Sequence, residues 1–206
     1  AARALNVTNE VGVGGKIRLL KNIMGLWLLQ ETRSQWEREG QRLGWAALVR
    51  LTDEAPPFQS LVDPDDALFF APGDMPTRLR QWCRTAGQTV PASHGAVVRC
   101  ILESLALKYA LVLAQLEDLL GLRLPTIHMV GGGVQNELLC QFTANATGRT
   151  VIAGPIEATA IGNLGMQLVG AGRLRDLNAL RAMVRASFAP KTYQPAEGEA
   201  WRSART

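Results

Sequence analysis

The stretch LPTIHMVGGGVQNELLCQFTANATGRTVIAGPIEATAIGNLGMQLVGAG, residues Leu124–Gly172, decides the fold, because short apolar runs alternate in it with glycine turns and helical patterns. Residues 124–130 are mainly apolar and stop at three glycines, and a run of that length favours a buried strand over a helix. A helix is predicted to begin near Gln135 and Asn136, directly after the glycines. Strand, glycine turn and helix make the first unit of the predicted fold.

A second unit of the same kind follows directly. The first helix is predicted to end at Gly148, because glycine is common just after helix C-termini, and residues 149–153 form the next apolar strand. After a further turn, another helix is predicted to begin near Glu157. Two consecutive strand-to-helix units predict parallel strands joined by right-handed connections.

The glycines at 131–133 are the best candidates for a ligand site. Glycine lets the backbone approach a ligand closely and adopt positive φ, and the positive end of the following helix attracts phosphate. The same glycines could equally serve a tight turn without a ligand. The dinucleotide fingerprint is incomplete, because Asn136 stands where its third glycine belongs. A phosphate loop of the GxxxxGK[ST] type is also absent, since Ile17 follows Gly15-Lys16.

Hydrophobic periodicity outlines the elements before and after this stretch. Residues 5–18 predict two strands joined by a hairpin around Gly12. Residues 19–39 predict a helix with Ile23 and Trp27 on its buried side. The other predicted elements are helices over 42–52, 77–87, 93–120 and 174–186, a surface connection over 53–76, and an extended tail after Pro190.

Length and composition indicate a globular chain of one domain, or of one domain with an insertion. Of its 206 residues, 47% are hydrophobic, which is enough for a sizeable core. The net charge of +4 comes from dispersed basic residues, without the basic stripe and aromatic platforms that nucleic-acid binding needs. The longest apolar stretch, 101–116, contains Glu103 and Lys108, so we expect no membrane span. Three cysteines and two histidines show no zinc-ligand spacing, and no signal peptide is visible, so a cytoplasmic protein is expected.

Two polar residues share one stripe of the helix predicted over 19–39. Asn22, Leu26 and Gln30 are four residues apart, which places them on one helical face. At 1.5 Å per residue, the outer two would stand about 12 Å apart, so one helix could contact two substrates. The alternative is that Asn22 caps the helix and Gln30 is only solvated.

Four stretches in one order resemble the FGGY carbohydrate kinases, and together they span most of the chain. The glycine stretch is similar to the adenine-nucleotide loop of that family and to the strand-helix unit that follows it. The other three stretches are NVTNE with LLKNIMGLWLLQE (6–31), VDPDDALFFAPGDM (62–75) and CILESLALKYA (100–110).

The resemblance implies an α/β fold of the ribonuclease H-like, actin-type class with extra helices. It identifies residues 1–190 as the C-terminal, nucleotide-binding lobe of such a kinase, with 191–206 as a tail. The implied activity is phosphorylation of a ketose, with L-rhamnulose as the expected sugar and with ATP and Mg²⁺ as cofactors. Such kinases are about twice as long, so the N-terminal lobe with the catalytic base is missing. The chain alone is therefore expected to be inactive.

The same resemblance implies roles for particular residues. Gly132 is similar to a backbone donor to ATP, whereas its neighbours could serve only the turn. Gln30 resembles an ATP contact and Asn22 a sugar contact, and Asn136 could contact ribose or base, or simply start the helix. The nucleotide set is thus Gln30, Gly131, Gly132, Gly133 and Asn136, with Asn22 for the sugar and no metal ligand.

Several other residues keep a structural interpretation. Glu157 is explained by the helix dipole, and Asn163 and Gly165 by packing. Asp65 and Asp66 are typical of Asx turns. The family resemblance leaves open a disulfide between Cys83 and Cys100, whereas a reducing cytoplasm favours thiols at both positions.

Two other functions stay open. The chain could be the lobe of another FGGY kinase, such as a fuculokinase or xylulokinase. It could also be a stand-alone domain that binds a nucleotide or a partner without catalysis. In either case, exposed apolar surface and unpaired strand edges predict self-association of the fragment.

Overall fold

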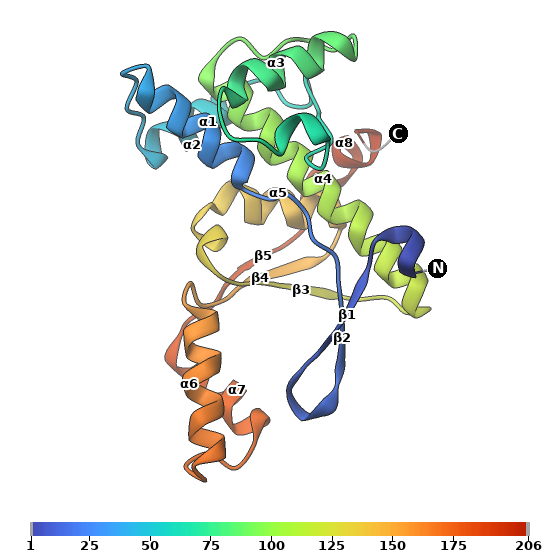
Figure 1. The fold of residues 1–206 in the computed structure, drawn as a ribbon, viewed down its shortest axis with the longest axis vertical. Coiled ribbons are helices and arrows are strands. Elements are labelled where there is room, and N and C mark those ends of the chain that lie inside the picture. Colours follow the sequence, from blue (N-terminus) through green and yellow to red (C-terminus); the bar gives the residue numbers. More distant parts are fainter. Residues whose placement is uncertain (1, 205–206) are drawn as a thin grey trace. The chain divides into compact units, whose positions relative to one another are not determined.

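The computed structural model describes residues 2–204, which form two compact units. The first unit runs to Arg123 and takes up the chain again from Arg202, and the second is Leu124–Trp201 (Figure 1). The division of the chain into a lobe over residues 1–190 and a tail over 191–206 stays a prediction. Residues 205–206 of that tail lie outside the described part. Within residues 2–204, no helix combines the length and the apolar character that a membrane crossing requires.

The first unit begins with a short 3₁₀ turn, η1 (Ala2–Leu5), and the predicted hairpin. Strands β1 (Thr8–Val11) and β2 (Ile17–Leu20) pair antiparallel, with Thr8 opposite Leu20. The connection is a 3₁₀ turn, η2 (Val13–Gly15), in which Gly14 has a φ of 72°. Within the described residues, these two strands form a sheet of their own.

Four α-helices form the body of the first unit: α1 (Trp27–Arg38), α2 (Trp45–Glu54), α3 (Met75–Thr85) and α4 (His94–Leu120). The sequence predicts α2, α3 and α4 to within a few residues, because their ends carry clear signals. Ser93 Oγ accepts a hydrogen bond from the Ala96 N–H at the start of α4, and Gly121 ends that helix with a φ of 65°. Helices α2 and α4 pack together, and the core includes Leu28, Leu29, Trp36, Leu48, Leu79, Ile101 and Leu105.

The prediction for the first helix is wrong at its N-terminus. Residues 17–20 belong to β2, and residues 21–26 have no regular structure before α1 begins at Trp27. Gly25 has a φ of 62°, a left-handed conformation that prevents the helix from starting earlier. The buried side of α1 carries Leu28 and Leu29, whereas Ile23 and Trp27 are only half-buried.

The stretch over 53–76 is more than the surface connection predicted from its prolines and aspartates. It contains a 3₁₀ turn, η3 (Ala67–Phe69), whose Phe69 is fully buried. Val62 is buried as well, and its N–H donates to Ser104 Oγ on α4 at 2.9 Å. The stretch therefore packs into the unit instead of lying over it.

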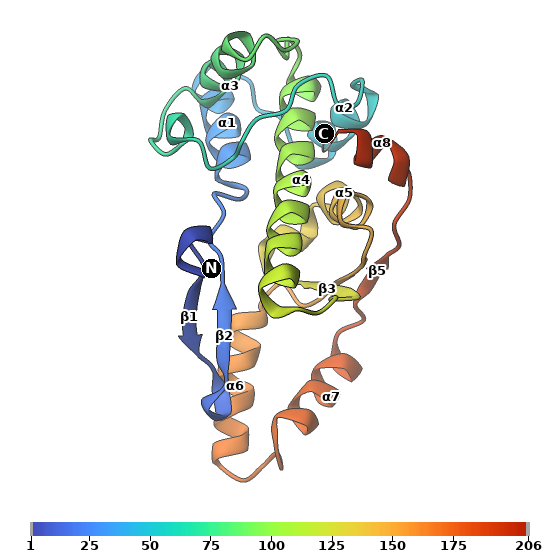
Figure 2. The same cartoon turned by 90° about the vertical axis from the view of Figure 1, so that its right-hand side faces the viewer.

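The second unit is a three-stranded sheet in the order β3-β4-β5. As predicted, β3 (Thr126–Met129) and β4 (Thr150–Ala153) are parallel and are connected through α5 (Glu137–Thr147), which ends at Gly148. Helix α5 covers one face, where Cys140 and Ala144 pack against Val151 and Ala153. Helices α6 (Ala158–Gly170) and α7 (Leu177–Ser187) lie on the other side of the strands (Figures 1 and 2).

Residues after Pro190 form structure where the sequence predicts an extended tail. Strand β5 (Lys191–Tyr193) pairs antiparallel with β4, and helix α8 (Gly198–Ser203) follows. Tyr193 and Trp201 are 7% and 1% exposed, so both belong to the core of this unit. The ring of Trp201 lies 5.2 Å from that of Phe142 on α5.

Candidate functional site

The glycine turn after β3 is the part of the second unit best suited to approach by a ligand. Gly131 has a φ of 85° and a ψ of −177°, a conformation that is essentially restricted to glycine. Gly132 has an ordinary φ and is exposed, and a Cβ atom at this position would meet no atom within 4 Å. The backbone conformation therefore requires a glycine at position 131. Neither the backbone conformation nor packing requires one at position 132.

Backbone hydrogen bonds join the two strand-to-helix turns. The Gly131 N–H donates to the Pro155 carbonyl oxygen at 3.1 Å, and the Gly154 N–H donates to the Met129 carbonyl oxygen at 2.7 Å. The turn after β3 is thus fixed by the turn after β4. Because both turns follow the carboxyl ends of parallel strands, they lie at the sheet edge where ligands bind in open α/β folds.

The chain next forms a 3₁₀ turn, η4 (Gly132–Gln135), and then α5. The N–H groups of Gly132 and Gly133 open this turn and donate to no other residue between 2 and 204. Asn136 caps α5, because its Oδ1 accepts a hydrogen bond from the Leu139 N–H at 3.0 Å. Backbone donors and the N-terminus of α5 thus lie together at the turn, which favours an anion.

A buried and mainly apolar layer supports the turn from behind. Val134 packs against the cluster formed by Cys140, Ala144, Val151, Ala153 and Tyr193. Burial and, to a smaller extent, the Glu137 carboxylate raise the pKa of the Cys140 thiol to about 11. Cys140 is therefore a protonated core residue at neutral pH and not a nucleophile of the site.

Of the residues at α6 that the sequence singles out, Gly165 serves packing, whereas Asn163, for which packing is also expected, is exposed. Glu157 precedes α6 at its N-cap position, and its side chain makes no capping hydrogen bond. Asn163 Oδ1 accepts from Gln167 Nε2 at 2.7 Å on the same helix. Gly165 is buried against Leu180 of α7, and the Cβ of a larger residue would overlap that side chain. The packing role expected for Gly165 is confirmed.

Asn22 and Gln30 do not share a helical stripe, because α1 begins between them. Asn22 lies in the irregular segment 21–26 and Gln30 on α1, and both are exposed. Neither side chain has a hydrogen-bond partner among residues 2–204. Both belong to the first unit, whereas Gly131–Gly133 and Asn136 belong to the second. The structure thus brings together the glycines and Asn136 and gives Asn22 and Gln30 a separate setting.

The Asx-turn prediction is confirmed for one of the two aspartates. Asp66 Oδ1 accepts from the Leu68 N–H two residues later, at 2.9 Å. The side chain of Asp65 instead accepts from the distant Met24 N–H at 2.9 Å and pairs with Lys108 at 3.0 Å. Nothing in the local sequence around Asp65 indicates these two contacts.

The cysteine pair is reduced in this structure. Cys83 and Cys100 are buried free thiols that share a hydrogen bond. That hydrogen bond lowers the pKa of Cys83 and, together with burial, raises the pKa of Cys100. Of the two states that the sequence leaves open, the structure therefore has the thiols.

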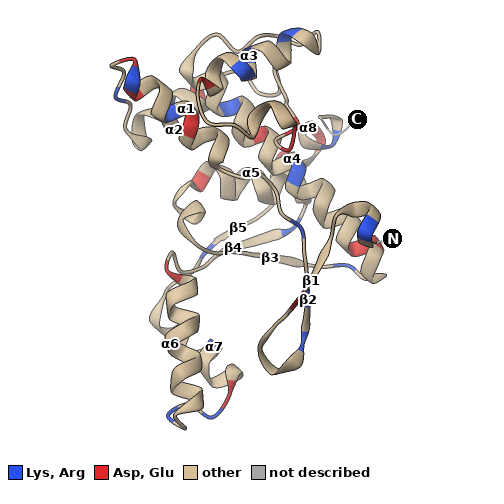
Figure 3. Ribbon diagram, viewed as in Figure 1, with Lys and Arg blue, Asp and Glu red and all other residues tan. Residues whose placement is uncertain are grey.

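An open apolar cavity of about 680 Å³ lies between the sheet and helices α6 and α7. Its lining includes His128 and Ile152 from the strands, Ile161 from α6 and Val184 from α7. Helix α6 carries no charged residue along its length (Figure 3), and Leu164 is 62% exposed. This side of the second unit therefore presents apolar surface to its surroundings.

The fold is similar to that of a solved sugar kinase. The crystal structure of xylulose kinase from Rhodospirillum rubrum matches with a TM-score of 0.62 and 16% identity, over 97% of this chain and 42% of that one. At this identity the likeness shows the fold. The α/β fold expected from the sequence is confirmed.

The model of the C-terminal domain of the FGGY family of carbohydrate kinases matches residues 1–171, and the chain belongs to this family. A curated rhamnulokinase of Bacteroides thetaiotaomicron is 48% identical over 98% of the chain and 41% of its own length. A rhamnulokinase of Enterococcus faecalis is 44% identical over 92% of the chain and 38% of its own length. The chain thus spans about two fifths of these relatives and corresponds to their C-terminal part.

Proposed function

We propose that the chain is the ATP-binding C-terminal lobe of a kinase that transfers the γ-phosphoryl group of ATP to the 1-hydroxyl of L-rhamnulose. The observation that carries this proposal is its 48% identity, along almost the whole chain, to a rhamnulokinase. The geometry of the second unit agrees with it, since an exposed glycine turn with free N–H donors suits a nucleotide phosphate. We expect this activity to be that of an enzyme of the cytoplasm.

Within this proposal, each contact expected from the sequence keeps its role. Gly132 donates from its backbone to the nucleotide, and its neighbours Gly131 and Gly133 shape the turn. Asn136 uses Oδ1 for its helix cap, which leaves its Nδ2 group as a donor toward ribose or base. From the first unit, the exposed Gln30 contacts ATP and the exposed Asn22 contacts the sugar.

The acidic residues of this chain do not offer a magnesium site of their own. Among residues 2–204, no three His, Cys, Asp or Glu side chains gather where they could hold a metal ion. Asp63 and Asp65 are already paired with Lys108. We infer that Mg²⁺ enters with ATP and is held by the phosphates and by residues outside this chain.

The remaining parts of the reaction belong to the N-terminal part that the relatives contain. Phosphoryl transfer needs a base near the attacking hydroxyl and the exclusion of water, which closure of two lobes provides. The apolar surface of α6 and the unpaired outer edge of β3 are suited to packing against such a lobe. The chain alone is therefore expected to phosphorylate no ketose.

Titration calorimetry of ADP with Mg²⁺ into this chain tests the nucleotide site. Gly132→Val leaves the backbone unstrained and fills the space over the turn, so we expect affinity to fall about tenfold or more, or about 1.4 kcal/mol. Gly170→Val is the matched control, because Gly170 also has an ordinary φ and open space. Equal affinity of the two variants would contradict a nucleotide site at Gly132.

The sugar is tested with the intact enzyme and a panel of ketoses. We expect the highest kcat/KM with L-rhamnulose and much lower values with fuculose and xylulose. A preference for xylulose would support the alternative kinase, which the 16% identity to a xylulose kinase does not favour. Absence of turnover with every sugar would support the non-catalytic alternative.

A further inference from the structure

The segment that carries Asn22 depends on contacts from outside itself for its conformation. Residues 21–26 join β2 to α1 without regular hydrogen bonding. Two contacts fix it: Lys21 Nζ donates to the Leu5 carbonyl oxygen at 2.7 Å, and the Met24 N–H donates to Asp65 Oδ1 at 2.9 Å. Because Met24 is only two residues from Asn22, its hydrogen bond constrains the backbone within about 7 Å of the Asn22 Cα.

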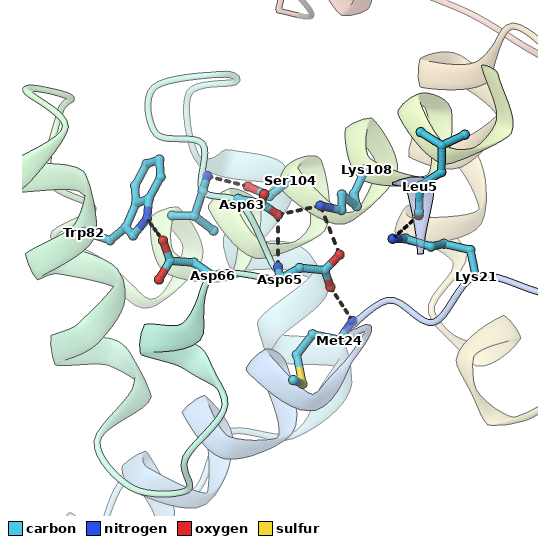
Figure 4. Close-up of polar contacts among 10 residues, drawn as sticks. Leu5, Lys21, Met24, Asp63, Asp65, Asp66, Trp82, Ser104 and Lys108 are labelled. Carbon is cyan, nitrogen blue, oxygen red and sulfur yellow. Dashed lines mark hydrogen bonds and ion pairs between the residues drawn. The ribbon is translucent and has the colours of Figure 1, made fainter. Parts of the chain in front are cut away.

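Asp65 is itself held in place by an ion pair. Its second oxygen, Oδ2, lies 3.0 Å from Lys108 Nζ, and the same ammonium lies 2.8 Å from Asp63 Oδ1 (Figure 4). The Lys108 side chain is only 14% exposed, so water competes little for this charge. Despite burial, the two aspartates raise the pKa of Lys108. Asp65 thus uses one oxygen to hold Met24 and the other to bind Lys108.

The loop around Asp65 is attached to two helices. The Asp65 N–H donates to Asp63 Oδ1 at 3.0 Å, and the Val62 N–H donates to Ser104 on α4. On the other side, Trp82 Nε1 of α3 donates to Asp66 Oδ2 at 3.1 Å. In Figure 4, Asp63 and Asp65 both point to Lys108, Asp65 also reaches the Met24 N–H, and Asp66 points to Trp82. The loop therefore provides a fixed base from which Asp65 can hold another segment.

We propose that Asp65, held by Lys108, is a positioning residue that sets the place of Asn22 for the ketose. This inference rests on the proposed function, in which Asn22 contacts the sugar. Asn22 contributes an exposed side chain with no other partner among residues 2–204, so its direction is determined by its backbone. Of the two contacts that fix this segment, the hydrogen bond between Met24 and Asp65 is the one that the backbone of the segment itself makes.

Kinetics of the intact enzyme distinguish positioning from general support of the fold. Asp65→Ala removes the acceptor of the Met24 N–H, and we expect the KM for the ketose to rise about tenfold, since hydrogen bonds to charged groups are among the stronger ones. The KM for ATP should change less than about twofold. Asp65→Asn retains an oxygen for Met24 and should restore the ketose KM to within about threefold of the wild type.

Asp66→Ala is the matched control. It removes two hydrogen bonds from the same loop, those from Leu68 and Trp82, but none to the segment 21–26. We expect the ketose KM to stay within about twofold of the wild type. An equal rise of the ketose KM in the Asp65→Ala and Asp66→Ala enzymes would overturn the proposal, because general loosening of the loop would then explain both.

A double-mutant cycle tests whether Asp65 acts through Asn22. In an Asn22→Ala background, Asp65→Ala should raise the ketose KM by less than about twofold, because the contact that it positions is already lost. If the effects of the two substitutions on the ketose KM are fully additive, then Asp65 does not act through Asn22 and the inference is wrong. If Asn22→Ala alone leaves the ketose KM unchanged, then the proposed sugar contact has failed.

Hydrogen exchange distinguishes a failure of the positioning role of Asp65 from a failure of the sugar contact of Asn22. The Met24 amide should exchange faster in the Asp65→Ala enzyme than in the Asp66→Ala enzyme, whether or not Asn22 contacts the sugar. If the Met24 amide exchanges faster in the Asp65→Ala enzyme but Asn22→Ala leaves the ketose KM unchanged, then Asp65 holds the segment and the proposed sugar contact is wrong. Equal exchange rates of the Met24 amide in the two variants would show that Asp65 does not hold the segment 21–26.

Discussion

At the scale of single residues, the ion pair around Lys108 has a definite pH dependence. Burial acts to raise the pKa of Asp63, but hydrogen bonds from Lys108 and from the Asp65 N–H outweigh it, and the net pKa is lowered from its ordinary value of 3.8. A carboxylate with a lowered pKa in the folded state stabilises the fold above its unfolded pKa. This contribution is lost as the pH falls through the folded pKa.

Asp63→Asn should therefore lower the urea midpoint of unfolding at pH 7, and the difference from the wild type should shrink as the pH falls below 3.8. Because the Asp63 side chain is 55% exposed, the effect is expected to be small. Asp53→Asn is the control, since Asp53 is exposed and its side chain has no partner among residues 2–204. The same pH profile for both variants would contradict the role of Lys108.

Cys140 gives a second test at this scale. With a pKa of about 11, only about one thiol in a thousand is ionised at pH 8. Iodoacetamide should therefore label Cys140 readily in urea and very slowly in the folded chain, as peptide mass spectrometry would measure. The stabilisation that goes with the raised pKa is fully present below the ordinary value of 9.0 and is lost progressively as the pH rises from there through about 11. Rapid labelling of the folded chain would contradict the buried layer behind the glycine turn.

At the scale of elements, strand β5 and the residues that follow it up to Trp201 complete the second unit. The antiparallel pairing of β5 covers β4 on the side away from β3, and Tyr193 and Trp201 fill the core beside α5. Loss of one large buried aromatic residue typically costs about 3–5 kcal/mol, whereas a whole domain is stable by only about 5–15 kcal/mol. The second unit cannot be expected to survive without this segment.

A chain that ends at Pro190 should therefore lose hydrogen-exchange protection throughout β3, β4 and α5. A chain that ends at Ser203 is the control and should keep it. Protected β4 amides in the shorter chain would mean that β5 is dispensable, as an extended tail would be.

The elements also differ in how far the sequence predicts them. Helix α4 and helix α5 are predicted closely, because each begins at a capping Ser93 or Asn136 and ends at a left-handed Gly121 or Gly148. Helix α1 is predicted too long, because its apolar pattern continues into β2 and the irregular segment. There the pairing of β2 with β1 and the contact of Met24 with Asp65 override local propensity.

At the scale of the whole molecule, the described chain leaves strand edges and apolar side chains uncovered. Sheet β1-β2 has no third strand among residues 2–204, and β3 has a neighbour on one side only. Val11 and Ile17 of the hairpin are 80% and 61% exposed. Open edges next to exposed apolar residues favour pairing with other chains.

We therefore expect the isolated chain to self-associate. Sedimentation equilibrium should give a weight-average mass that rises above 22.3 kDa with concentration. Replacing both Val11 and Ile17 with Lys should shift the rise to higher concentrations, because charges on an edge oppose pairing. A constant 22.3 kDa at every concentration would refute this expectation.

The sequence by itself determined the local parts of this protein: the hairpin, the parallel strand-helix units, the glycine turn and most helix ends. Those features depend on residues a few positions apart, such as a glycine that must adopt positive φ or an asparagine that caps its own helix. Tertiary structure decided the setting of Asn22, the two-sided role of Asp65, and the folding of residues after Pro190. These depend on partners about 40 residues away, as in the pairing of Val151 with Tyr193 and the hydrogen bond of Met24 with Asp65. Local sequence patterns do not indicate such partners, because long-range contacts form only when the whole chain packs.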